Sequence, residues 1–471
     1  MHTMTINGSA VRGEGALGVI NPATGKVFAD APRCSQTQLD AAVDAAAAAY
    51  PGWRSDLDAR RNALRKAAEA LAASVDELAP LLSSEQGKPI GSMALGDAAF
   101  EVNGSAMWLQ YTAELALSPE VVQDDEAAHV EILRRPLGVV AAITPWNFPL
   151  LLACMKIGPA LLAGNTMVLK PSPFTPLSTL KLGEIFGSAL PPGVLNVVSG
   201  GDELGAWMTS HPGVRKVSFT GSVATGKAVA VAAASDLKRV TLELGGNDPA
   251  IVLDDVDVSA VADGLFWGAM ANCGQICTAI KRVYAPRNLH DQLVDALADR
   301  ARSVKVGIGT EPDTQMGPIN NRPQLDRVTE LVNDAVARGG SVAAGGNRLD
   351  GDGYFFQPTV LSAVSDGMRI VDEEQFGPVL PVVAYDGVED AVRRANDTHF
   401  GLSGSVWSAD PDRAAAVASR LECGTSWINT HLAVGPHIPF GGSKWSGIGV
   451  ENGSWGLLGF TEIQVLYRPR G

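Results

Sequence analysis

The chain contains little that points to an extracellular, membrane-bound or nucleic-acid-binding protein. Its five cysteines are odd in number and scattered, and no basic and apolar signal pattern opens the sequence. We therefore expect reduced thiols and a cytoplasmic location. Positive charge is also scarce, with 37 Lys and Arg against 51 Asp and Glu and a net charge of -14. That balance argues against nucleic acid or an acidic membrane surface as a partner.

Three further features are missing. The longest apolar run, Leu150 to Leu162, contains Lys156 and Pro159 and is shorter than the roughly 20 residues that a membrane span needs. No transmembrane helix is therefore expected. Cys273 and Cys277 have no second Cys or His pair at metal-ligand spacing, so we expect no metal site. The dinucleotide fingerprint G-x-G-x-x-G does not follow any predicted strand.

The length and the local patterns predict an α/β protein with more than one lobe. A chain of 471 residues exceeds what one hydrophobic core usually supports. Residues 1–34 are expected to form an irregular arm or an edge hairpin. Alanine-rich stretches at 41–49 and 59–73 read as helices, with starts predicted at Thr37 and Ser55.

Short, nearly all-apolar segments alternate with helical segments, which is typical of parallel sheets buried on both faces. The first set is expected at Val139–Ile143, Met167–Leu169, Val194–Val198 and Val217–Phe219. A second set is expected at Ala250–Leu253, Arg282–Ala285, Val379–Ala384 and Ser426–Ile428. His129–Leu133 and Ile463–Tyr467 alternate like edge strands, which are usually paired, and another subunit is one possible partner.

Residues 271–282 include the candidate nucleophile, Cys277. A thiol reacts as thiolate, and a helix start after Gly274-Gln275 would lower its pKa and offer N–H groups to an oxyanion. The alternative is that Cys277 is a small buried apolar residue. The segment Thr220 to Lys227 reads as strand, glycine turn and helix with Ser222 at the N-cap, where a phosphate could bind. The alternative is an ordinary αβ turn without a ligand, because many such turns have the same sequence pattern.

Taken together, several motifs resemble the aldehyde dehydrogenase superfamily from about residue 20 to residue 468. They are Pro145-Trp146-Asn147-Phe148-Pro149, Lys170-Pro171-Ser172, Phe219-Thr220-Gly221-Ser222, Glu243-Leu244-Gly245-Gly246, Gly274-Gln275-Ile276-Cys277, Glu374-Gln375-Phe376-Gly377-Pro378 and Pro439-Phe440-Gly441-Gly442. The resemblance implies a two-lobe α/β fold: a Rossmann-like parallel-sheet coenzyme domain, an α/β catalytic domain and a small β oligomerisation extension. It assigns residues 1–114 and 137–244 to coenzyme binding, 245–445 to catalysis, and 115–136 and 446–471 to oligomerisation or bridging.

For catalysis, the resemblance implies oxidation of an aldehyde to the carboxylic acid. Cys277 is then the nucleophile, the Asn147 amide and the Cys277 N–H hold the oxyanion, and Glu243 activates water against the thioester. Outside these motifs, the alternative interpretation is that Asn147 is a turn residue before Pro149. Glu243 is then a surface carboxylate at the end of a strand.

For the coenzyme, the resemblance implies NAD, with NADP possible. The residues it assigns to coenzyme binding are Trp146, Lys170, Ser172, Gly221, Ser222, Gly245, Glu374 and Phe376. One departure is Pro173, which stands where many NAD-preferring relatives have Glu. The carboxylate that would repel a 2′-phosphate is therefore missing at this position.

By motif offset, the substrate pocket is expected to be mostly apolar and to favour a neutral aldehyde. Its expected lining is Phe148, Leu152, Met155, Ile276, Thr278, His431 and Val434. His431 is alternatively a satisfied loop histidine. The resemblance also implies a homodimer or homotetramer.

Three other functions are weighed against hydrolytic dehydrogenation. A CoA-acylating enzyme is disfavoured by Glu243, a catalytically silent coenzyme-binding protein by the intact catalytic elements, and a cysteine hydrolase by the lack of a His motif to pair with Cys277.

Overall fold

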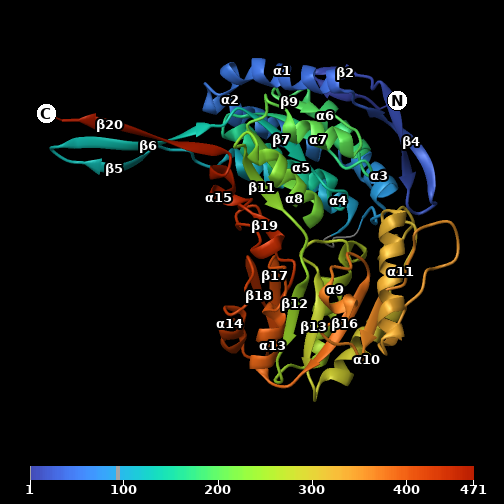
Figure 1. Cartoon of the computed structure of the whole chain (residues 1–471). Coiled ribbons are helices and arrows are strands. Elements are labelled where there is room, and N and C mark those ends of the chain that lie inside the picture. The colour runs from blue at the N-terminus through green and yellow to red at the C-terminus, as the bar shows by residue number, and fades with distance from the viewer. Residues whose placement is uncertain (1, 92–95, 471) are drawn as a thin grey trace.

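The computed structural model describes residues 2–91 and 96–470. The chain forms two α/β lobes and a long β arm that projects from the first lobe (Figure 1). The first lobe carries the N-terminal half of the sequence, and the second holds most of the C-terminal half. The segment after β11 passes from one lobe to the other, so the predicted two-lobe α/β fold is confirmed.

An eight-stranded sheet forms the centre of the first lobe, in the order β19-β11-β10-β7-β8-β9-β1-β2. Strands β7 to β11 are parallel, as the buried apolar runs predicted, and β1, β2 and β19 are antiparallel additions at the edges. The strands are β1 (Met4–Ile6), β2 (Ser9–Val11), β7 (Val139–Ile143), β8 (Thr166–Lys170), β9 (Leu195–Val197), β10 (Lys216–Thr220), β11 (Arg239–Glu243) and β19 (Gly447–Ile448).

Helices cover this sheet and connect its strands. Ser35 caps the first helix through a capping box with Gln38, and Asp56 caps the second. The starts predicted at Thr37 and Ser55 were therefore two residues late and one residue early, because the Ser35 hydroxyl and the Asp56 carboxylate supply the caps. The helices of this lobe are α1 (Gln36–Trp53), α2 (Leu57–Ala72), α3 (Val75–Gln86), α4 (Ala98–Ala113), α5 (Pro149–Leu162), α6 (Leu177–Phe186), α7 (Asp202–Ser210), α8 (Val223–Ala234) and α15 (Gly453–Leu458).

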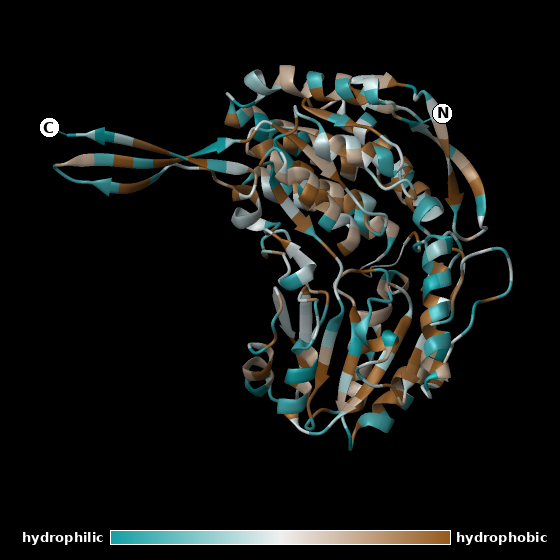
Figure 2. Cartoon of the chain, in the orientation of Figure 1, coloured by the Kyte–Doolittle hydropathy of each residue, from teal (hydrophilic) through white to brown (hydrophobic). Residues whose placement is uncertain are grey.

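The second lobe is built on a seven-stranded sheet in the order β14-β15-β16-β13-β12-β17-β18, parallel except for β14. Its strands are β12 (Asp248–Val252), β13 (Ile280–Pro286), β14 (Ser341–Ala344), β15 (Thr359–Ser362), β16 (Val379–Tyr385), β17 (Ser403–Trp407) and β18 (Thr425–Ile428). Its helices are α9 (Val258–Met270), η1 (Ala271–Gly274), α10 (His290–Ser303), α11 (Arg322–Ala337), α12 (Arg369–Asp372), α13 (Val388–Asn396), α14 (Pro411–Ala418) and η2 (Lys444–Ser446). Figure 2 shows the apolar strands at its centre.

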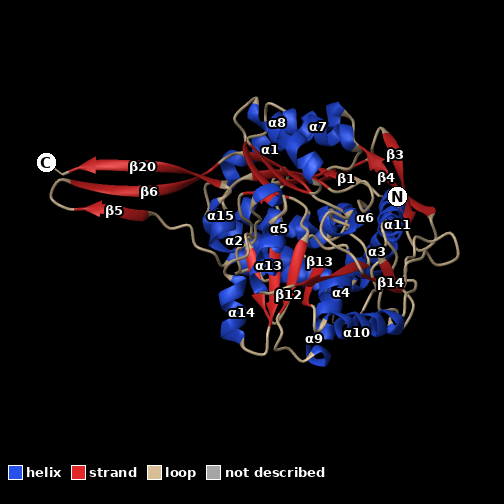
Figure 3. Ribbon diagram, turned by 60° about the horizontal axis from the view of Figure 1, so that its bottom comes forward, coloured by secondary structure: helices blue, strands red, loops and turns tan. Residues whose placement is uncertain are grey.

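The arm is a three-stranded antiparallel sheet of β5 (Glu120–Asp124), β6 (Ala128–Pro136) and β20 (Thr461–Pro469). It stands clear of both lobes when the molecule is turned (Figure 3). The prediction of two edge strands is right for β20 and wrong for β6, which pairs with a strand on each side. Ile463, Val465 and Tyr467 on β20 are each about 60% exposed.

At the other end of the chain, residues 2–34 contain two hairpins. One is β1 with β2, which joins the first sheet through β9, and the other pairs β3 (Gly15–Asn21) with β4 (Lys26–Arg33). The expected edge hairpin is therefore present. No helix in the described ranges is long and apolar enough to span a bilayer.

Candidate active site

The strand order of the first lobe creates the crevice in which the site lies. The chain crosses from β7 to β8 and β9 on one side, then returns to β10 and β11 on the other. In such open sheets, ligands bind beyond the carboxyl ends of the strands, where the order reverses. That point lies between β7 and β10. Asn147 follows β7, Lys170 ends β8, Gly221-Ser222 follows β10, and Glu243 ends β11.

A cavity of about 70 Å³ joins residues from both lobes. Asn147, Glu243 and Cys277 line it together. The rest of its wall is mostly apolar. The lining is Trp108, Phe148, Leu151, Leu152, Met155, Thr220, Leu244, Ile276, Thr278, Leu432, Val434, Phe440, Glu451 and Asn452.

His431 does not line this small cavity but lines the larger one described below. Its Nε2 lies 2.7 Å from the Thr278 carbonyl, and its Nδ1 lies 3.0 Å from the Ser405 hydroxyl. Burial lowers the pKa of the ring to about 3. His431 is therefore a neutral, hydrogen-bonded loop residue, in line with the alternative reading. Trp108 and Leu432 take places in the wall that motif offsets did not suggest.

The nucleophile candidate Cys277 lies in a turn that leads into β13, so the predicted helix start is wrong. The preceding residues form a tight 3-10 turn in which Asn272 and Cys273 have left-handed φ angles of 51° and 59°. Gly274 also has a positive φ of 68°, and a side chain there would collide with the Gly377 carbonyl. The pattern suited a helix start because glycine and glutamine before an apolar run are equally compatible with this turn.

Burial raises the pKa of the Cys277 thiol, and the carboxyls of Asp248, Glu374 and Glu243 raise it further. The site therefore opposes formation of the thiolate in this state, since a thiolate would sit among buried acids. A hydrogen bond with the Thr278 backbone N–H lowers the pKa of the thiol and partly offsets these effects.

Asn147 is held with its amide at the nucleophile loop. Its Nδ2 donates to the Gln275 backbone carbonyl at 3.0 Å. The backbone carbonyl of Asn147 accepts from Lys88 Nζ at 2.9 Å and from Asn272 Nδ2 at 3.1 Å. Lys88 in turn pairs with the buried carboxylate of Glu101 at 2.5 Å. A carboxamide has two N–H protons, so one proton of Asn147 remains for an oxygen in the cavity.

Glu243 is buried, and neither of its oxygens has a hydrogen-bond partner among the described residues. Burial raises its pKa well above the usual value, Glu451 raises it further, and Lys156 lowers it. An unpaired buried carboxyl facing a cavity fits a group that acts on a water molecule.

Lys156 and Glu451 form a buried ion pair behind Glu243, at 2.5 Å between Nζ and Oε1. Sequence reasoning missed both residues as parts of the site. Lys156 gave one signal, a charge inside the apolar run from Leu150 to Leu162, but Glu451 stands outside every motif.

The residues expected to bind coenzyme surround the crevice. Ser222 caps α8 by accepting from the Thr225 N–H at 3.2 Å, which confirms the predicted N-cap. Burial lowers the pKa of Lys170 to about 8, and among the described residues its Nζ has a single hydrogen bond, to the Pro171 carbonyl at 3.3 Å. Ser172 is buried beside it and accepts from the Phe174 N–H.

Glu374 lies across the crevice, where burial raises the pKa of its carboxyl to about 7. It accepts from the Gly246 N–H at 3.1 Å, and the adjacent Gly245 leaves room for its carboxylate. Phe376 meets Trp146 edge to face, with ring centroids 5.2 Å apart. Lys170 Nζ therefore has spare donors on one side of the crevice, and the Glu374 carboxyl has spare acceptor capacity on the other.

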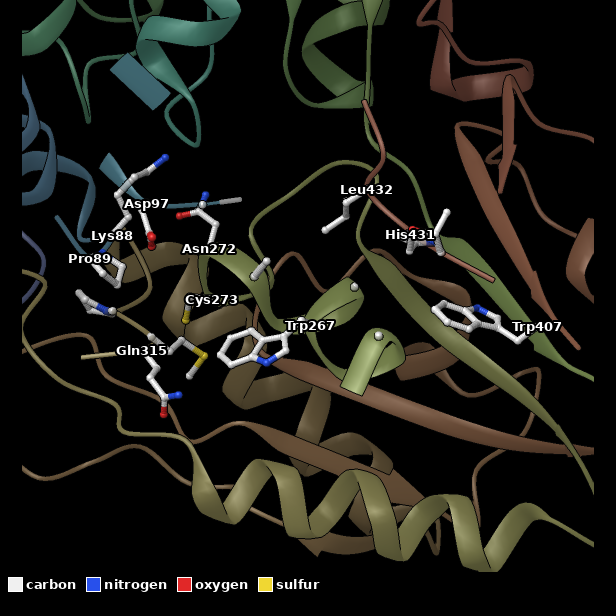
Figure 4. A pocket seen from close by; sticks show the side chains of 18 of the residues that line it. Lys88, Pro89, Asp97, Trp267, Asn272, Cys273, Gln315, Trp407, His431 and Leu432 are labelled. Carbon is white, nitrogen blue, oxygen red and sulfur yellow. The ribbon is translucent and has the colours of Figure 1, made fainter. Parts of the chain in front are cut away.

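A larger cavity of about 400 Å³ lies on the other side of the nucleophile loop (Figure 4). Asn272, Cys273 and Trp267 line it, and Leu432 lines both this cavity and the smaller one. Figure 4 shows Lys88 and Asp97 at one end and Trp407 at the other. No group of three or more potential metal-ligating side chains occurs in the part of the chain that the structure describes.

Comparison with known proteins agrees with this geometry. The sequence model of the aldehyde dehydrogenase family matches residues 11–466. A putative aldehyde dehydrogenase, FUS7, of Gibberella fujikuroi is 38% identical over 449 residues, covering 95% of this chain and 94% of the relative. Aldehyde dehydrogenase LUC3 of a Fusarium species is also 38% identical, over 451 residues, with the same coverage of both chains.

Solved structures agree as well. An NAD⁺ complex of an aldehyde dehydrogenase from Bacillus cereus superposes with a TM-score of 0.96 at 38% identity, over 100% of this chain and 97% of that one. A betaine aldehyde dehydrogenase mutant from Staphylococcus aureus, in complex with NAD⁺, has a TM-score of 0.95 at 33% identity and covers 100% and 98%.

Proposed function

Because this chain belongs to the aldehyde dehydrogenase family, we propose that it is a hydrolytic, NAD(P)-dependent enzyme that converts an aldehyde to its carboxylic acid. One observation carries this proposal: a thiol, a carboxamide and an unpaired carboxyl line one apolar cavity, as Cys277, Asn147 and Glu243.

The crevice fits a dinucleotide, with NAD as the default. The start of α8 at Gly221-Ser222 offers N–H groups to a pyrophosphate, Lys170 has donors to spare for a ribose, and Glu374 has free acceptor capacity for another. Trp146, Ser172, Gly245 and Phe376 complete the proposed coenzyme residues. When bound, NAD supplies the oxidant that takes two electrons and a proton from the substrate. NAD complexes of structural relatives support the choice.

In the first half of the reaction, the Cys277 sulfur attacks the aldehyde carbon and forms a thiohemiacetal. The free N–H of the Asn147 amide and the Cys277 backbone N–H hold the oxyanion. Such donors stabilise charge that develops during attack, and losing one typically costs about 10²–10³ in rate. Oxidation converts the adduct to a thioester on Cys277.

In the second half, Glu243 takes a proton from water, and the resulting hydroxide attacks the thioester carbon. The bond between the acyl carbon and the Cys277 sulfur then breaks, which releases the carboxylic acid and leaves Cys277 as thiolate. Lys156 and Glu451 lie next to Glu243 as a buried ion pair, and we propose that their charges set the protonation state of the base.

The walls of the small cavity favour a neutral, apolar aldehyde. Phe148, Leu152, Met155, Ile276 and Val434 surround the nucleophile, and no Arg or Lys lines this cavity among the described residues. A carboxylate on the substrate would have no partner there. We propose that the larger cavity, which shares Leu432, accommodates the remainder of a longer substrate.

We further propose a homodimer or homotetramer in the cytoplasm. The apolar residues exposed on β20 and its open strand edge support assembly through the arm, and five free cysteines fit a reducing compartment. The proposed domain division follows: residues 1–114 and 137–244 bind coenzyme, 245–445 carry catalysis, and 115–136 with 446–471 form the assembly segments. Sedimentation of the wild type and of a Val465→Glu variant tests the assembly.

The function is tested by a panel of aliphatic, aromatic and acidic aldehydes, each assayed with NAD and NADP, with and without coenzyme A. We expect free acid as the product and no dependence on coenzyme A. Product formed only with coenzyme A would indicate an acylating enzyme. Coenzyme binding without turnover across the panel would indicate a catalytically silent protein.

A further inference from the structure

Lys281 is a buried cation directly behind the nucleophile loop. It is the second residue of β13, it is 0% exposed, and its Nζ donates to the Gly274 carbonyl at 2.5 Å. The ammonium group also lies over the ring of Phe376, 5.5 Å from its centroid. Lys281 therefore links the turn that carries Cys277 to the loop that carries Glu374 and Phe376.

Two other fully buried lysines each have a dedicated carboxylate, whereas Lys281 has none. Lys88 pairs with Glu101 and Lys156 pairs with Glu451, both at 2.5 Å. For Lys281, no ion pair within 4 Å is formed with any described residue. Burying an ammonium group without a paired anion costs desolvation free energy. The charge of Lys281 therefore stabilises an anion that forms nearby.

The groups that face Lys281 come from each element packed around it. Glu374 precedes β16, Asp248 begins β12, Cys277 and Cys273 lie in the nucleophile loop, and His431 lies in the loop after β18. Glu243, which also faces Cys277, belongs to β11. Three of these are acids, so Lys281 is the cation of the group.

The electrostatic coupling of Lys281 to Cys277 works in both directions. Burial lowers the pKa of Lys281 to about 8, and the charges of Glu374, Asp248 and Cys277 raise it. By linkage, an anionic Cys277 that favours the ammonium form is itself favoured by the ammonium form to the same extent. A hydrogen bond with the Thr278 backbone N–H also lowers the pKa of Cys277. No helix start is present at Cys277, and both ring nitrogens of His431 have other partners.

We propose that Lys281 is a positioning residue that holds the Gly274 carbonyl and supplies the positive charge that stabilises the Cys277 thiolate among its acidic neighbours. The inference rests on the proposed role of Cys277 as nucleophile. It adds a buried cation that is hydrogen-bonded to the nucleophile loop before substrate arrives. Lys281 does not line the substrate cavity, so it acts through Cys277 and the loop.

The test is the pH dependence of Cys277 alkylation by iodoacetamide, measured by mass spectrometry without coenzyme or aldehyde. Lys281→Met keeps the length of the side chain and removes its charge. We expect the pH midpoint for alkylation to rise by about one unit, which corresponds to about tenfold slower alkylation at pH 7. Lys281→Arg keeps the charge and should stay within about threefold of wild type. Lys26→Met, at an exposed position on β4, is the control and should not change.

Coincident pH profiles for wild type and Lys281→Met would overturn the proposal. Equal shifts in Lys281→Met and Lys281→Arg would also overturn it, because packing and not charge would then be responsible. If Lys281→Met does not fold, Lys281→Ser replaces it with the same expected shift. The proposed function fails separately, if Cys277→Ala retains turnover.

Discussion

The side-chain amide of Asn147 donates to the backbone carbonyl of Gln275 across the boundary between the two lobes, at 3.0 Å. Asn147 follows β7 of the first lobe, and Gln275 precedes the nucleophile in the second. Asn272 of the second lobe also donates, from Nδ2 to the Asn147 backbone carbonyl, and Lys88 Nζ donates to the same carbonyl. The oxyanion donor and the nucleophile loop are therefore held together by hydrogen bonds in both directions across the boundary. A relative shift of the lobes would disturb both groups together.

Replacing the nucleophile separates chemistry from coenzyme binding. Cys277→Ala is expected to abolish dehydrogenase turnover and to leave coenzyme affinity nearly unchanged, because the thiol forms the covalent bond but does not hold the dinucleotide. Steady-state assays and coenzyme titration measure the two effects. Cys273→Ala is the matched control: Cys273 is buried in the core of the second lobe, and its loss should be nearly neutral in catalysis. Activity within tenfold of wild type in Cys277→Ala would contradict the assignment.

Glu243→Gln keeps the shape of the side chain and removes its basicity. Steady-state turnover is expected to fall by about 10²–10⁴, the range for losing a general base, while the first turnover survives. Rapid mixing with aldehyde and NAD should show a burst of NADH near one equivalent per active site, and mass spectrometry should find acyl adduct on Cys277. Glu462→Gln, exposed on the arm, is the control.

The pH dependence of this step has a definite sign. Burial and Glu451 raise the pKa of Glu243, so its carboxyl is protonated at low pH and becomes a base only as the pH rises. Hydrolysis of the acyl adduct should accelerate with pH in the wild type and lose that rise in Glu243→Gln. If the burst falls together with the steady state, Glu243 acts before oxidation.

The strands were predictable because burial on both faces leaves a continuous apolar run. The prediction at Val139–Ile143 matches β7 at both ends, and the other predicted strands agree with the structure to within three residues at each end. The surroundings of Cys277 were not predictable from local pattern, since a left-handed turn and a helix start accept the same residues. Lys156 and Glu451 stand 295 residues apart, and no local signal connects them.

Cavity shape should control the choice of aldehyde. Met155 projects from α5 into the wall of the small cavity, so Met155→Ala should enlarge the cavity. The ratio of kcat/KM for hexanal to that for acetaldehyde is expected to rise about tenfold, within the 1–3 kcal/mol that one methylene contributes to selectivity. Met208→Ala removes another buried methionine, from α7 and away from the cavity, and should cost stability without changing the ratio. An unchanged ratio in Met155→Ala would mean that the substrate chain leaves the site by another route.

Asp248→Asn tests an acid that opposes the thiolate. Burial raises the pKa of Asp248 to about 8, so below that pH the carboxyl is largely neutral and its replacement should change iodoacetamide alkylation of Cys277 by less than about twofold. Above that pH the wild-type carboxylate forms and raises the pKa of the thiol, so at pH 9 the variant should react several-fold faster, as expected for a fraction of one pKa unit. A faster reaction at pH 6 would show that Asp248 is already ionised there.

Coenzyme preference should depend on position 173. Lys170 and Ser172 lie at the carboxyl end of β8, and Pro173 follows them where a carboxylate would accept from a ribose hydroxyl and repel a 2′-phosphate. Asp202 and Glu203 at the start of α7 already act on Lys170 through their charges, and Arg33 partly neutralises Glu203. We expect Pro173→Glu to raise the ratio of kcat/KM with NAD to that with NADP. The expected change corresponds to about 1–3 kcal/mol in activation free energy, the range for charge-assisted hydrogen bonds. Pro191→Glu adds the same charge before β9, at the amino ends of the parallel strands and away from the coenzyme crevice, and should leave the ratio unchanged. Equal ratios in Pro173→Glu and wild type would mean that residue 173 does not face the ribose.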